Sequence, residues 1–238
     1  MPLHTLASWL LLSCVARQEG RLDNRQEVVS EAMAGHLGEA AQARDAVIAG
    51  DMAGARAALL ALRARLPLAA LAPQPARIEG GFIADVDAAI EAPDLPTLAE
   101  HLGEMAQGCG ACHTASGLRI PVDTGGRVPT GQAGSTPTVT ARMLLHQEAD
   151  LVMWSALVAG DEGAFVSAAE AMRRSTLVPS GIAVDAPVPP LAAELEVRVQ
   201  DLAALASRES DGRGLYLGRM LGTCAQCHGL LARGPAAP

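Results

Sequence analysis

The chain has 238 residues, of which 50% are hydrophobic, 18% are charged and 2% are aromatic. The apolar fraction excludes a mainly disordered protein, and the net charge of −8 argues against a general nucleic-acid-binding protein. Helix-forming alanine and leucine dominate the apolar residues, whereas β-branched and aromatic residues are sparse. We therefore expect an all-α protein whose core contains some bulk other than aromatic side chains.

Residues 1–16 have the features of a secretory signal segment. An apolar run that includes Leu10–Leu12 is followed by polar residues from Arg17, and cleavage after Ala16 would leave small residues at the recognition positions. Alternatively, the residues up to Cys14 form a loose lipobox that makes this cysteine a lipid anchor, or the segment is a buried N-terminal turn. No run of about 18 uncharged apolar residues occurs, so we expect no transmembrane helix in the mature chain.

The rest of the chain contains two copies of one unit. Residues 28–67 align with residues 138–177 at an offset of 110, and a five-residue insertion raises the offset to 115 further along. The aligned pairs that matter most are Met33 and Met143, His36 and His146, Cys109 and Cys224, Cys112 and Cys227, and His113 and His228. We predict two domains, 24–118 and 139–234, joined by a Gly-, Pro-, Ser- and Thr-rich linker over 119–138.

Each unit has the pattern of four helices. In the first helix of unit one, apolar residues recur at helical spacing from Val29 to Val47; Gly50 ends this helix and Asp51 caps the next. Asp150 interrupts the matching apolar face in unit two. The helices are expected around 29–47, 52–66, 78–89 and 98–112, and again at 139–159, 162–174, 190–208 and 213–231. Short connections favour antiparallel packing, so we expect two tandem four-helix bundles.

The last helix of each unit contains the motif C-x-x-C-H. Its residues are Cys109, Cys112 and His113 in unit one, and Cys224, Cys227 and His228 in unit two. This motif attaches a c-type haem. On a helix, cysteines three residues apart share a face, so both sulfurs can reach the two vinyl groups at one edge of a porphyrin. The adjacent histidine can then bind the iron.

Three other chemistries use such cysteines. A redox-active C-x-x-C pair normally accompanies a βαβ pattern, which this sequence lacks. A zinc site needs four converging ligands, and each unit offers two cysteines and an adjacent histidine, unless both units share one ion. A disulfide across a single helical turn would be strained. Because the whole motif recurs at matching positions, we predict two covalently bound haem c groups.

A four-helix bundle with C-x-x-C-H in its last helix resembles the class II c-type cytochromes, the cytochrome c-prime group. The resemblance covers each unit and so most of the chain, although the usual member carries a single haem. It implies that the first helix covers the distal side of the haem. An apolar distal residue would leave the iron five-coordinate and open to small gases, whereas a methionine would close it.

The distal candidates are two residues of the first helix in each unit: His36 and Met33 in unit one, and His146 and Met143 in unit two. The resemblance places the distal residue at about the depth of the histidines. An imidazole on an apolar face also needs a polar partner or a metal. We therefore predict histidine as the sixth ligand, with methionine, an open iron or a packed core histidine as the alternatives.

Together these expectations describe an exported dihaem cytochrome that transfers electrons between redox partner proteins in the bacterial periplasm, either soluble or lipid-anchored. Two histidine ligands saturate each iron, so we expect no enzymatic activity and no catalytic residues. The alternative function is a protein that binds NO or CO at one or more five-coordinate haems, similar to the cytochromes c-prime. A peroxidase-like enzyme would need a distal acid–base residue, for which the sequence offers no convincing candidate.

Overall fold

The structure, a computed structural model, describes residues 33–65, 76–117, 139–175 and 189–231. These residues form helices and turns without any strand, which confirms the all-α class for the described part. The first described helix covers residues 33–49. The others are α2 (Met52–Ala64), α3 (Ala76–Glu91), α4 (Leu95–Ala115), α5 (Val139–Ala159), α6 (Glu162–Arg174), α7 (Pro190–Arg208), the short η1 (Ser210–Gly212) and α8 (Arg213–Leu231).

Some of the sequence predictions lie outside the described residues. They are the signal segment 1–16 with Cys14, the linker 119–138, and the ends of both predicted domains. Among the described helices, none is both long and apolar enough to cross a membrane.

A glycine and an aspartate end one helix and start the next in each half. Gly50 and Gly160 have φ angles of 78° and 72°, which side chains disfavour and glycine tolerates. The following residues, Asp51 and Asp161, cap α2 and α6 by accepting hydrogen bonds from backbone N–H groups at 2.8 and 2.9 Å. The predicted turns are therefore confirmed in both halves.

The third helix of the first half, α3, contains two adjacent glycines, which have a low helix propensity. Gly80 and Gly81 lie within α3, and a methyl group added to either would meet nothing within 4 Å. An exposed glycine costs helix stability but does not change the packing. The buried face of α3, which includes Phe82, Val86 and Ala89, is sufficient to hold the helix against α4.

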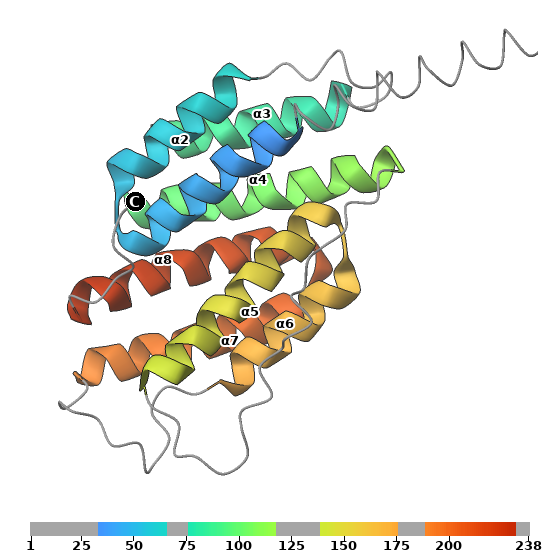
Figure 1. Cartoon of the computed structure of the whole chain (residues 1–238). Helices are drawn as coiled ribbons and strands as arrows, with labels where there is room; N and C mark the ends of the chain where they lie inside the picture. Colours follow the sequence, from blue (N-terminus) through green and yellow to red (C-terminus); the bar gives the residue numbers. More distant parts are fainter. Residues whose placement is uncertain (1–32, 66–75, 118–138, 176–188, 232–238) are drawn as a thin grey trace, which may run out of the picture.

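Helices α4 and α8 pack against each other along the middle of the molecule (Figure 1). Glycines allow the approach: a methyl group on Gly103 would lie 2.7 Å from the backbone nitrogen of Gly218, and one on Gly218 would lie 2.7 Å from the Cα atom of Glu100. The other helices of each half lie on either side of this central pair (Figure 1). The low content of large side chains thus gives close backbone packing between the two halves.

The packing also crosses the boundary between the halves at α5. This helix is the first of the second half, yet it packs more extensively against α4 of the first half than against α8 of its own. Helix 33–49 also contacts the other half, because its Arg44 lies against Asp150 and Trp154 of α5. The halves are therefore joined by their first helices as well as by their last.

Candidate functional site

The two C-x-x-C-H motifs lie in the last turns of α4 and α8. In α4 the helix continues through the motif, and the N–H of Ser116 donates to the Cys112 carbonyl at 2.9 Å. The four described cysteines are free thiols, each partly buried. The spacing of three residues on a continuous helix keeps both thiols of a pair on one face, as the sequence predicted.

Burial raises the pKa of three of these thiols, Cys109, Cys224 and Cys227. Burial raises the pKa of Cys109 to about 12, and the neighbouring Cys112 and Asp85 add to the rise. Burial and the negative charge of Asp150 raise the pKa of Cys224 as well. A redox-active dithiol depends on a readily formed thiolate. Cys109 and Cys224, the first thiols of the two motifs, are therefore poor candidates for the nucleophile of a redox-active pair.

The motif histidines both engage a backbone carbonyl through the same ring nitrogen. Nδ1 of His113 lies 2.6 Å from the carbonyl oxygen of Val158, and Nδ1 of His228 lies 3.1 Å from that of Ile48. A carbonyl oxygen can only accept, so Nδ1 must carry the proton and donate it. In that tautomer Nε2 holds the lone pair, which is the arrangement of most metal-binding histidines.

The two acceptor carbonyls occupy matching positions in the repeat. Ile48 and Val158 lie near the C-terminal ends of helix 33–49 and α5, at the offset of 110 residues. Each motif histidine therefore contacts the first helix of the opposite half. Burial lowers the pKa of His113, which keeps its imidazole neutral and able to bind a metal.

The predicted distal histidines are buried, as their place on the apolar face implied. His36 and His146 are each 8% exposed. Nε2 of His36 lies 3.4 Å from the Arg65 carbonyl, and Nε2 of His146 hydrogen-bonds the matching carbonyl of Ser175. Burial lowers the pKa of His36, so its ring is the neutral form. These nitrogens, which would have to face an iron, point to the end of the second helix of the same half.

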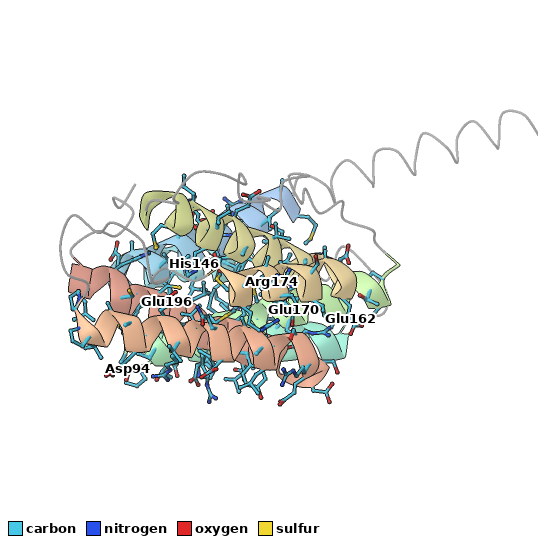
Figure 2. All side chains as sticks on the ribbon, turned by 90° about the horizontal axis from the view of Figure 1, so that it is seen from below. Asp94, His146, Glu162, Glu170, Arg174 and Glu196 are labelled. Atoms are coloured by element: carbon cyan, nitrogen blue, oxygen red, sulfur yellow. The ribbon has the colours of Figure 1, made fainter. Side chains whose placement is uncertain are left out.

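The remaining predicted ligands and the surroundings are less specific. Met33 and Met143 are half-buried; Met33 is the first described residue of its helix, and Met143 lies in the second turn of α5. Figure 2 shows His146 on α5 and Glu196 on α7 towards the same end of the second half. Glu196 is buried and, after burial itself, is the second cause of the raised pKa of Cys227. Within the described residues, no three His, Cys, Asp or Glu side chains gather as a metal-ion site.

One charged cluster was not predicted as part of a site. Asp150, which interrupts the apolar face of α5, is 7% exposed and lies 4.0 Å from Nε of the buried Arg44. The guanidinium group of Arg44 lies 5.7 Å from the centre of the Trp154 ring. Arg44 also donates to the carboxylate of the adjacent Asp45, at 2.9 Å from Nε. Burial raises the pKa of Asp150 to about 6; Arg44 opposes the rise and Asp45 adds to it. The influence of Asp150 on Cys224 shows that this cluster is close to the second motif.

The repeat alignment gave little indication of this cluster. Ala40 and Arg44 of the first half match Asp150 and Trp154 of the second. These positions do not stand out in the alignment, because every residue from 37 to 45 differs from its match in 147–155; only the break that Asp150 makes in the apolar face marks the place.

Comparison of the chain with protein-family models, curated proteins and solved structures found no match. The resemblance to the class II c-type cytochromes therefore rests on the motif, its position in the last helix and the helical fold.

Proposed function

We propose that the chain is an exported c-type cytochrome with two covalent haems that transfers electrons between periplasmic redox partners. In this proposal each half forms a four-helix unit similar to a cytochrome c-prime. The supporting observation is the pair of motif histidines, both of which use Nδ1 on a backbone carbonyl and so present Nε2 as the ligand nitrogen. The same donor set, two thiols and one such imidazole, occurs at the end of both α4 and α8.

The residues of the chain fit a haem at both motifs. Cys109 and Cys112 would form the thioethers at the first site, and Cys224 and Cys227 at the second, with His113 and His228 as the proximal iron ligands. Each haem supplies an iron that gains and loses one electron. Two porphyrins would also provide the large flat apolar bodies that a chain with 2% aromatic residues otherwise lacks.

We assign the sixth position of each iron to His36 and His146. Both imidazoles are buried, and neutral imidazole is the form that binds a metal. Each ring would exchange its hydrogen bond with the Arg65 or Ser175 carbonyl for the iron. Saturated iron has no place for a substrate, which agrees with a function in electron transfer and not in catalysis.

Haem attachment is tested on the full chain, made in a bacterium that attaches c-type haem. The expected product carries two haems that survive acid extraction, and replacing both cysteines of one motif by alanine removes one haem. A chain that carries no covalent haem would refute the proposal. Mass measurement of the N-terminus also distinguishes cleavage after Ala16 from lipidation of Cys14.

The sixth ligand is tested by electron paramagnetic resonance of the ferric protein. His36→Ala and His146→Ala should each convert one haem from low spin to high spin, because each removes one strong ligand. His101→Ala is the matched control, since His101 lies on α4 and pairs with Glu104 at 3.1 Å. Met33→Leu should leave the spectrum unchanged; a loss of low-spin signal in this variant would assign the ligand to methionine.

The hydrogen bonds of the distal histidines favour a second candidate function. If His36 and His146 keep their Nε2 atoms on the Arg65 and Ser175 carbonyls, each iron stays five-coordinate. The protein would then bind NO or CO instead of only carrying electrons. High-spin ferric haem in the unmodified protein, with rapid CO binding after reduction, would establish this function and refute ligation by two histidines.

A further inference from the structure

The end of the first helix in each half lies against the motif of the opposite half. The carbonyl of Val158, two residues before Gly160 at the end of α5, accepts the hydrogen bond from His113 at 2.6 Å. The carbonyl of Ile48 lies 3.1 Å from Nδ1 of His228. A hydrogen bond from a motif histidine to the first helix of the opposite half therefore occurs twice. Its two copies lie at matching positions of the repeat, so the contact follows the internal symmetry of the chain.

At the first motif this contact is tight enough to exclude a single methyl group. One added to Gly160 would meet the hydroxyl of Thr114 and come within 2.9 Å of the Gly110 carbonyl oxygen. A methyl group on Gly110, between the two cysteines, would lie 3.1 Å from the backbone nitrogen of Gly160 and closer still to the Leu157 carbonyl. The last turn of α5 therefore rests directly on the backbone of the first motif.

At the second motif the corresponding contact is looser. Ala225 stands in the place of Gly110, and a methyl group on Gly50 would meet none of the described residues within 4 Å. His228 is half-buried, whereas His113 is 3% exposed. The two sites thus share one design but differ in how firmly the opposite half holds the histidine.

We propose that each haem site is completed by the opposite half: the last turn of α5 positions His113, and the last turn of helix 33–49 positions His228. The inference rests on the proposed haem attachment. Because the bond from Nδ1 fixes the plane and the basicity of a ligand imidazole, a change at the end of α5 alters the haem held by α4. In the same way, a change at the end of helix 33–49 alters the haem held by α8.

The test measures both haem potentials in the full-length, haem-loaded protein. His113→Met and His228→Met assign the two potentials, because methionine ligation raises the potential of the haem concerned. Gly160→Ala should then shift the potential and the low-spin signal of the haem at Cys109 and Cys112, and leave the other haem unchanged. Gly81→Ala on α3 is the control: its methyl group would meet none of the described residues within 4 Å, it lies outside both first helices, and it should shift neither potential.

A milder reciprocal pair keeps the test valid if Gly160→Ala fails to fold. Val158→Ala should alter the haem of the first motif, and Ile48→Ala should alter the haem of the second. Variants that change only the haem of their own half, or neither haem while both are attached, would overturn the inference. A protein without covalent haem would instead refute the proposed function, and mass measurement recognises that result before any potential is recorded.

Discussion

The two halves of the molecule repeat one set of backbone contacts but differ in the side chains that join them. Both halves end their first helix at a glycine of positive φ, cap the second with aspartate and hydrogen-bond a buried histidine to the end of that second helix. At the contact between the first helices, however, Arg44 faces Asp150 and Trp154. The repeat therefore preserves the fold of each half, whereas the differences specify how the halves pair.

The nature of these differences is informative. Two halves identical to the first would place Arg44 against an alanine and a second arginine, because Asp150 and Trp154 match Ala40 and Arg44. This chain instead has arginine in one half and a carboxylate with an indole ring in the other, which attract. A buried ion pair adds little stability over apolar packing, but leaving one partner alone is costly. The pairing of the halves should thus depend on both partners being present.

Among the substitutions that test this difference between the halves, removal of Arg44 should lower the unfolding free energy most. Arg44→Ala removes the buried packing of the arginine side chain and its stacking on Trp154, and obliges Asp150 to take up a proton, so we expect a combined loss of about 4 kcal/mol in unfolding free energy near neutral pH. Urea unfolding, followed by circular dichroism, measures it. Adding Asp150→Ala, which restores the alanine found at position 40, should recover most of the loss; no recovery would show that the two side chains are not coupled.

The glycine contact between α4 and α8 should give the next largest effect. Gly103→Ala places a methyl group 2.7 Å from the backbone of Gly218, so the helices must separate, at a cost of about 3 kcal/mol. Gly222→Ala is the control on the same pair of helices, because its methyl group would lie at an ordinary 3.5 Å from Pro96. Equal melting temperatures for the two variants would contradict the close packing.

The helices of this fold could be predicted from the sequence because their boundaries depend on local chemistry. The four ranges expected in the second half, 139–159, 162–174, 190–208 and 213–231, agree with α5 to α8. In the first half, α4 starts at Leu95, before the first apolar marker at Leu98, because Asp94 accepts a hydrogen bond from the Thr97 N–H at 2.9 Å. A cap followed by proline was a signal for that start.

The partners of the candidate site residues could not be predicted in the same way. Helical periodicity identified the buried face that bears His36, but not the Arg65 carbonyl that its ring contacts. The C-x-x-C-H motif predicted that His113 is an iron ligand, but not that a carbonyl of the opposite half accepts the hydrogen bond from its Nδ1. Apolar spacing shows which face of a helix is covered without showing which helix covers it. The sequence showed Asp150 only as a charged residue on an otherwise apolar helix face. It could not show that the partner, Arg44, lies in the other half.

The pH dependence of the unfolding free energy tests Asp150 separately from Arg44, because only the carboxyl group titrates in the accessible pH range. The folded protein raises the pKa of Asp150 to about 6, above the ordinary value of 3.8. Because the folded state then holds the proton more tightly than the unfolded chain, the carboxyl contributes stability that is complete below its ordinary pKa. This contribution is lost as the pH rises through about 6.

Compared with an Asp150→Asn variant, the unmodified protein should gain about 2 kcal/mol between about pH 7 and about pH 4.5. Urea unfolding of both proteins over this range measures the gain. The lowered pKa values of His36 and His113 act in the opposite direction in both proteins, and they cancel in the difference. A difference between the two proteins that does not change with pH would show that Asp150 is ionised throughout.

The smallest expected effect tests whether the two halves are equivalent away from their contact. Asp51 and Asp161 accept backbone hydrogen bonds of 2.8 and 2.9 Å at matching positions. Replacing either by alanine should therefore cost about 1 kcal/mol, and the same amount in both halves. Thermal unfolding of the two variants side by side measures the costs. A much larger cost for one variant would mean that this helix end also supports the pairing of the halves, and that the asymmetry extends beyond Arg44 and Asp150.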